Sequence, residues 1–246
     1  MRLLLLALLI LTLPSCGGSY SLVEMQNESR SIQESEGESN ELEAVIAPYR
    51  NQLALEMSTV LCQSERAMVK ARPESALGNF VSDLCLAKAR ELDDQPIDFA
   101  LFNHGGLRTA LPQGDITVGK VFELMPFENE LVVVTLSKDK ILEMMDYLIM
   151  RGGEPVAEIK LRAKGGELES IRIGEQELED RDYRVVTSDY LANGGDEMTF
   201  LTEESRSDFK QLGLKIRDCI MMHCRQLGDE GATINTKSDG RIVIED

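Results

Sequence analysis

Apolar residues recur every three to four positions in several stretches of the chain. This spacing places them on one face of a helix and so predicts amphipathic helices. Ser75 is a suitable N-cap for the second of them, because its hydroxyl can accept from a free backbone N–H. Gly152 and Gly153 follow the fourth, as glycine commonly does after a helix. The predicted helices cover residues 41–55, 76–92, 117–123, 138–150 and 207–224.

Between the helices, short apolar runs bounded by turn residues predict strands. Two of them flank Lys164-Gly165-Gly166, which indicates an antiparallel hairpin. Strands and helices alternate irregularly, and this order favours a mixed α/β (α+β) domain with helices layered on a mixed, partly antiparallel sheet. The predicted strands cover residues 57–62, 97–102, 131–136, 156–161, 168–173, 183–188 and 240–244.

Three loops next to predicted strands concentrate polar and aromatic side chains. Residues 103–108, N-H-G-G-L-R, place an amide and a guanidinium on either side of two glycines, which let a ligand approach the backbone closely. Residues 125–129, M-P-F-E-N, use a proline to fix the chain before an aromatic ring and an amide. Residues 190–196, Y-L-A-N-G-G-D, follow another strand. Loops of this composition are suited to hold a planar polar ligand.

These loops also carry a family resemblance. The order N-x-G-G-[LI]-R, I-T, P-F-x-N and then an aromatic before N-G-G-D resembles the C-terminal domain of the 5'-nucleotidases, which cleave nucleoside phosphates and related esters outside the cytoplasm. R-P-E-S-x-L-G-N-x-x-x-D, beginning at Arg72, resembles the family segment in which an arginine before a helix reaches the substrate. The resemblance extends from about residue 41 to the end of the chain.

The resemblance implies substrate-binding roles for seven residues. In the family two aromatic rings stack on the two faces of the nucleobase, and the matching positions here are Phe127 and Tyr190. Such stacking is worth roughly 1–3 kcal/mol per base in single-strand binders. Asp196 matches the residue that binds ribose hydroxyls. The other four can read the base edge through amides or bind carboxylate, phosphate or hydroxyl groups through guanidinium forks: Asn103, Asn129, Arg108 and Arg72.

Each of these roles has a purely structural alternative. Phe127 could pack in the core after its proline, and Asp196 could hydrogen-bond its own glycine turn. The two arginines could form local ion pairs instead, Arg108 with Asp115 or Glu123 and Arg72 with Glu74.

The charge of the chain narrows the class of ligand. The formal net charge is −17, from 43 acidic and 26 basic residues. A surface of that sign repels a phosphate backbone, so we expect no nucleic-acid polymer as a partner. It does not exclude a single nucleotide held by one or two local arginines.

The N-terminus reads as an export signal. Arg2 is followed by an apolar run over residues 3–13 that is too short for a membrane span. The run ends L-P-S-C-G, which resembles the bacterial lipobox and implies acylation of Cys16; the alternative is an ordinary cleaved signal with a chance cysteine. We therefore expect a signal peptide over 1–15, a flexible acidic tether over 16–40, and a folded domain over 41–246. The chain is then an exported lipoprotein, tethered in a bacterial envelope through its lipid.

Hydrolytic chemistry is not expected from this chain. A metal pair needs several His and carboxylate ligands, and the chain has two scattered histidines, His104 and His223, so we expect neither a metal nor another cofactor. It also lacks a G-x-S-x-G elbow. Cys62 and Cys85 could pair, although buried free thiols are the default expectation.

The resemblance implies where the missing chemistry would come from. Full-length members of the family carry an additional metallophosphoesterase domain that binds the divalent metal pair. Our first hypothesis is a nucleotide- or nucleoside-recognising domain that acts in nucleotide breakdown with a separate metallophosphoesterase chain. The alternatives are a nucleoside-binding lipoprotein without a hydrolase partner, and a structural envelope protein whose loops only stabilise the fold.

Overall fold

The computed structural model describes residues 40–245. The predicted signal peptide, the predicted tether and Cys16 lie outside these residues. Helix α2 (Asn40–Met57) forms where the apolar spacing predicts a helix. Within residues 40–245, no helix combines the length and the apolar character that a membrane crossing requires.

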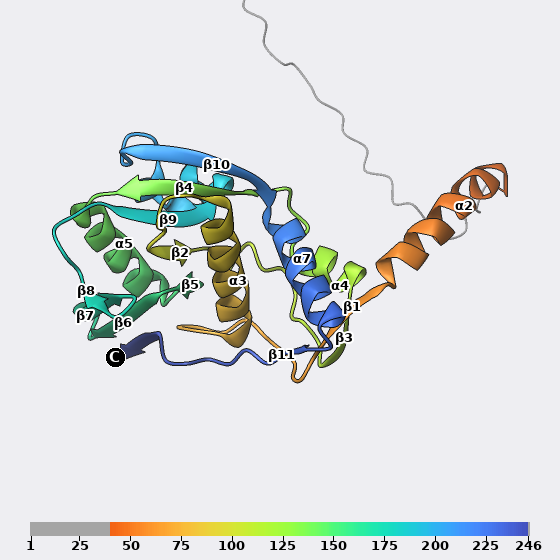
Figure 1. Ribbon diagram of the computed structural model, residues 1–246, viewed down its shortest axis with the longest axis horizontal. Coiled ribbons are helices and arrows are strands. Elements are labelled where there is room, and N and C mark those ends of the chain that lie inside the picture. The colour runs from red at the N-terminus through yellow and green to blue at the C-terminus, as the bar shows by residue number, and fades with distance from the viewer. Residues whose placement is uncertain (1–39, 246) are drawn as a thin grey trace, which may run out of the picture. The chain divides into compact units, whose positions relative to one another are not determined.

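A five-stranded mixed sheet forms the centre of the fold from Ala47 onward (Figure 1). β2 and β9 run parallel, and the other neighbours are antiparallel. The predicted mixed, partly antiparallel sheet is therefore confirmed. Its order is β10 (Asp208–Lys215), β4 (Glu130–Leu136), β9 (Tyr183–Ser188), β2 (Phe99–Leu101) and β5 (Val156–Ala157).

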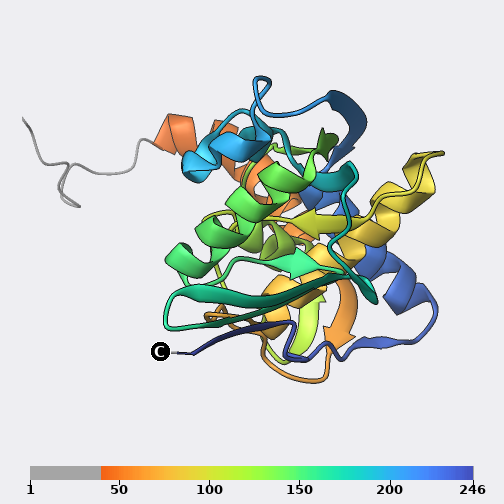
Figure 2. The ribbon, with the colours of Figure 1, turned by 90° about the vertical axis from the view of Figure 1, so that its left-hand side faces the viewer.

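The central sheet separates two hydrophobic cores. Successive side chains of a strand point to opposite faces. Leu131 and Val133 of β4 accordingly pack in one core, and Val132 and Val134 pack in the other. The first core contains residues of α3 (Ala76–Leu92), α4 (Val118–Leu124) and α7 (Ile216–Asp229). The second contains residues of α5 (Lys138–Arg151) and of the hairpin formed by β6 (Ile159–Lys164) and β7 (Glu167–Ile173), which lies next to α5 (Figure 2).

Two smaller sheets complete the domain. One has the order β11 (Thr233–Ile234), β1 (Val60–Ser64) and β3 (Gly114–Thr117). The other adds β12 (Ile242–Glu245) and β8 (Gln176–Glu177) to the two sides of the β6–β7 hairpin.

Local signals in the sequence locate several element ends. The Ser75 hydroxyl accepts a hydrogen bond from the Gly78 N–H at 3.0 Å and caps α3, as predicted. Gly152 adopts the left-handed conformation that ends α5. The predicted strand over 183–188 and the hairpin around Gly165 are also confirmed.

The predicted helix over residues 207–224 is confirmed in its second half and wrong in its first half. Residues 208–215 form strand β10, which pairs with β4, and α7 begins only at Ile216. The backbone of β10 pairs with that of β4, so that β10 becomes the edge strand of the central sheet. This long-range pairing overrides the local helical pattern. The β10 register shifts between Gln211 and Lys215, around Gly213, a residue that also disfavours a helix interior.

The four cysteines of the described part of the chain are buried free thiols. The pairing of Cys62 with Cys85 that the sequence left open is not formed. Cys62 instead interacts with Cys224, and Cys85 interacts with Cys219. Burial raises the pKa of the Cys85 thiol well above its usual range, so this thiol stays protonated and unreactive.

Candidate ligand-binding site

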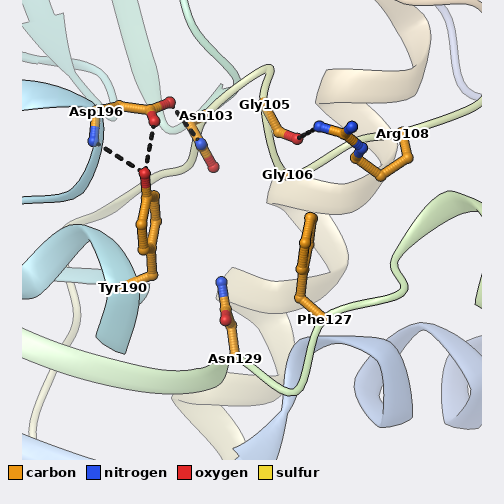
Figure 3. A pocket seen from close by; sticks show the side chains of 8 residues that line it. All are labelled: Asn103, Gly105, Gly106, Arg108, Phe127, Asn129, Tyr190 and Asp196. Atoms are coloured by element: carbon orange, nitrogen blue, oxygen red, sulfur yellow. Dashed lines mark hydrogen bonds between the residues drawn. The ribbon is translucent and has the colours of Figure 1, made fainter. Parts of the chain in front are cut away.

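Three loops converge on one pocket of about 270 Å³ (Figure 3). This volume is close to the lower end of the usual range for ligand pockets, ~300–1,000 Å³. Six of the seven residues predicted to bind substrate line it, together with the backbone of two glycines. The lining residues are Asn103, Gly105, Gly106, Arg108, Phe127, Asn129, Tyr190 and Asp196.

Asn103 lies in the turn after β2, where it is buried and lines the pocket. A Cβ on Gly106 would lie 2.9 Å from the Asn103 amide oxygen, so glycine is needed for the turn to fold back on this amide. The Gly106 N–H donates to the Asn103 carbonyl at 3.2 Å. The two glycines of the motif therefore serve the turn itself as well as access to its backbone.

Asp196 is the centre of a hydrogen-bond network. Its Oδ2 accepts from Asn103 Nδ2 at 2.6 Å, and its Oδ1 accepts from the Tyr190 hydroxyl at 2.9 Å. The Tyr147 hydroxyl donates to the Asp196 carbonyl at 2.7 Å. These bonds hold Asp196 in a left-handed conformation (φ +52°), which is uncommon for a residue other than glycine. Each carboxylate oxygen has two acceptor sites, so Asp196 can still accept from ligand hydroxyls.

Tyr190 stands on one side of the pocket with 46% of its surface exposed. A side chain at Gly195 would overlap the Tyr190 ring, so the ring lies directly on the backbone of the N-G-G-D turn. The hydrogen bond to Asp196 raises the pKa of the Tyr190 hydroxyl, which keeps it protonated as a donor at neutral pH. The ring is thus held from its hydroxyl end.

Phe127 stands on the opposite side, 38% exposed, with the Asn129 side chain between the two rings (Figure 3). It does not pack into the core, which was the structural alternative for it. The Arg108 guanidinium carbon lies 5.7 Å from the centre of the Phe127 ring, within the range of a cation–π contact.

Arg108 is exposed at the pocket edge. Its Nη1 donates to the Gly105 carbonyl at 3.3 Å. Within residues 40–245 it forms no ion pair with Asp115, Glu123 or any other carboxylate, so its remaining donors can reach a ligand.

The structure places Arg72 outside the pocket. Its guanidinium donates to the carbonyls of Arg151 and Gly153 and forms an ion pair with Glu154 at 2.8 Å, in place of the alternative partner Glu74. The side chain of Glu154 is only 1% exposed, and its Oε2 accepts from the His104 N–H at 2.6 Å. Arg72 therefore acts on the 103–108 turn through Glu154 rather than by lining the cavity.

His104 lies on this turn and is half-buried. Burial, and then the positive charges of Arg72 and Lys70, lower the pKa of its imidazole to about 4, so it is neutral at pH 7. In the part of the chain that the structure describes, no group of three or more His, Cys, Asp or Glu side chains could hold a metal ion.

Three further residues hold the pocket together and are not evident from the sequence motifs. Asp189 Oδ1 accepts from the Glu130 and Tyr190 N–H groups, at 3.1 and 2.8 Å, and so joins the start of β4 to the Tyr190 loop. Glu154 supports the 103–108 turn, and Arg217 at the start of α7 contacts the loop that carries Phe127. The G-E-P sequence around Glu154 is an isolated acid after a helix end, and only its burial in the fold distinguishes it.

Comparison with known proteins identifies one family. Residues 56–203 match the family described as 5'-nucleotidase, C-terminal domain. The chain is 30% identical over 206 residues to the trifunctional nucleotide phosphoesterase protein YfkN of Bacillus subtilis, a match that covers 74% of this chain and 13% of that protein. It is 29% identical over 143 residues to a 5'-nucleotidase of Vibrio parahaemolyticus, covering 54% of this chain and 24% of the relative.

A solved structure shows the same fold. The 5'-nucleotidase precursor from Thermus thermophilus superimposes with a TM-score of 0.71 and 27% identity, over 83% of this chain and 43% of that chain. In each of these three comparisons the chain spans less than half of the length of the protein it matches.

Proposed function

Because this chain belongs to the family of 5'-nucleotidase C-terminal domains, we propose that its pocket binds the nucleoside part of a nucleotide. The observation that carries the proposal is the arrangement of Phe127 and Tyr190 on opposite sides of one cavity, with the Asn129 side chain between them (Figure 3). A flat base between two rings gains stacking on both faces, worth roughly 1–3 kcal/mol per base by analogy with single-strand binders.

The polar groups of the pocket match the remaining parts of a nucleoside. Asp196 faces the cavity with free acceptor sites for ribose hydroxyls, while Asn103 and Tyr190 fix its orientation. Asn129 offers both a donor and an acceptor to the base edge. Arg108 supplies a positive charge at the rim, suited to an anionic substituent of the ligand.

Within this proposal the phosphoester is cleaved by a metallophosphoesterase chain that supplies the divalent metal pair. The relatives named for phosphoesterase and 5'-nucleotidase activity are much longer than the segments that match this chain. Binding energy from the non-reacting nucleoside would then position the ester at the metals of the partner. The lipobox-like sequence at Cys16 supports an exported, membrane-tethered location for this step.

Calorimetric titration of the purified protein with adenosine, AMP and a cyclic nucleotide tests the binding step. We expect saturable binding that falls about 5- to 150-fold on replacing either Phe127 or Tyr190 by Ala, the factor that corresponds to 1–3 kcal/mol of stacking. Saturable binding that both replacements leave unchanged would falsify the proposed clamp. No binding of any of the three ligands by the wild-type protein would overturn the nucleoside-binding function.

A further inference from the structure

Arg217 is a buried arginine directly behind the loop that carries Phe127. It lies in the first turn of α7, and only 6% of its surface is exposed. Its guanidinium carbon lies 4.3 Å from the centre of the Phe122 ring, which covers one face of the charge. Burying a charge carries a desolvation cost that its hydrogen bonds and ion pairs must offset. Among the described residues, the Nη groups of Arg217 make such contacts, while its buried Nε has no hydrogen-bond partner.

The two Nη groups of Arg217 are directed at the Phe127 loop. Nη1 donates to the Phe127 carbonyl at 3.2 Å and to the Met125 carbonyl at 3.4 Å, and Nη2 forms an ion pair with Glu128. One planar group therefore contacts three of the five residues 125–129. The neighbouring Ile216 N–H donates to the Asn129 carbonyl at 3.0 Å and fixes the far end of the same loop.

We infer that Arg217 is a positioning residue for the ligand site, which sets the place of the Phe127 ring by holding the backbone on both sides of Pro126. It does not line the pocket itself. The inference rests on the proposed function in so far as the ring is taken to stack on a ligand. Its physical basis is that a half-exposed ring on a short loop has little packing of its own, so its position follows the backbone that carries it.

Lys215 provides a matched control. It also forms an ion pair with Glu128, but it donates to neither carbonyl of the loop, and its side chain is 40% exposed. Removing Lys215 therefore changes the charge next to Glu128 while the backbone contacts of Arg217 remain. Lysine in place of Arg217 keeps a positive charge but lacks the planar fork that reaches several acceptors at once.

The test is a double-mutant cycle with two readouts. Adenosine affinity is measured by calorimetry for the wild type, Arg217→Lys, Phe127→Ala and the double variant, with Lys215→Gln as the control. Hydrogen exchange of the peptide covering residues 125–130 is measured in the same proteins without ligand. We expect Arg217→Lys to weaken adenosine binding about 5- to 20-fold in the wild type but less than about twofold in the Phe127→Ala background, because the two residues act as one unit.

We also expect faster exchange of residues 125–130 in Arg217→Lys and unchanged exchange in Lys215→Gln. An equal loss of affinity in the presence and absence of the Phe127 ring, or unchanged exchange, would overturn the inference. Should Arg217→Lys fail to fold, Arg217→Gln, which removes the guanidinium that contacts the Met125 and Phe127 carbonyls, is measured in its place, and unchanged exchange in that variant has the same meaning. If the wild type binds no adenosine, the proposed function fails, while the exchange readout still decides whether Arg217 orders the loop.

Discussion

On one side of the pocket, Asp196 binds Asn103 and Tyr190 directly, side chain to side chain. On the other side, the Phe127 ring is placed through the carbonyls that Arg217 holds from behind. The first arrangement fixes the direction of each polar group, which a ligand with hydroxyls requires. The second leaves a ring face open to the cavity, which stacking requires. The pocket thus combines a polar side that orients a ligand with an apolar side whose support lies outside the cavity.

Replacing Gly195 by Ala should break the polar side most severely. The new Cβ would overlap the Tyr190 ring, so the ring has to move off the backbone and lose its bond to Asp196. We expect a loss of adenosine affinity of about 30- to 100-fold and a stability loss of about 1–3 kcal/mol, as for other overpacked sites. Calorimetric titration and denaturant unfolding measure the two effects. Replacing Gly165, which has open space around it, by Asn is the matched control and should leave affinity unchanged.

Removing the central carboxylate should have the next largest effect. Asp196→Ala leaves the Asn103 amide and the Tyr190 hydroxyl without their acceptor. Unpaired polar groups of this kind cost about 1–3 kcal/mol, and we expect a fall of about tenfold in adenosine affinity. The affinity for a ligand without ribose hydroxyls, such as free adenine, should fall less than the affinity for adenosine. Equal losses for adenosine and adenine would contradict a ribose-binding role for Asp196.

The support beneath the 103–108 turn can be tested through Glu154. Glu154→Gln keeps the shape but replaces one carboxylate oxygen by an amide nitrogen, which cannot accept from both Arg72 and the His104 N–H. We expect a loss of about 1–2 kcal/mol in the free energy of unfolding, measured by denaturant titration. Arg72→Lys should lower the free energy of unfolding by less than Glu154→Gln does. In the Glu154→Gln background it should lower it hardly at all, because Arg72 acts on the turn through Glu154.

Acid should weaken the same turn through His104. The pKa of His104 is lowered to about 4 in the folded protein, from about 6.5 in an unfolded chain. Between these values the unfolded state binds more protons than the folded state. The contribution of neutral His104 to the free energy of unfolding is therefore fully present above pH ~6.5 and is lost as the pH falls toward ~4. We expect His104 to contribute a loss on the order of 1 kcal/mol over this window, discounted for its partial exposure. Unfolding at pH 7 and pH 4.5 in wild type and His104→Asn measures the difference; an identical pH dependence would refute it.

The smallest effect is expected at Lys215. Its pair with Glu128 is exposed to solvent, and exposed ion pairs contribute little to stability. Lys215→Gln should therefore leave Tm unchanged within experimental error, in contrast to changes at the buried Arg217 on the same carboxylate. A decrease in Tm in Lys215→Gln as large as that in Arg217→Lys would contradict this prediction. It would mean that Arg217 stabilises the protein through its charge pair with Glu128, as Lys215 does, and not through its contacts with the loop backbone.

The sequence predicts what is local and misses what depends on distant contacts. Ser75 and Gly152 mark helix ends because caps act within a few residues, and the loop motifs locate six residues of one pocket. Residues 208–215 form a strand despite their helical pattern, because their backbone pairs with β4, more than seventy residues earlier in the chain. The ion pair of Arg72 with Glu154 is not predicted for the same reason, since the two residues are distant in sequence.

The most direct test is a crystal structure of the protein with adenosine. We expect the base to lie between the rings of Phe127 and Tyr190, with the ribose hydroxyls bonded to Asp196. Adenosine bound with its base away from these two rings, or a pocket that stays empty at saturating adenosine, would contradict the account.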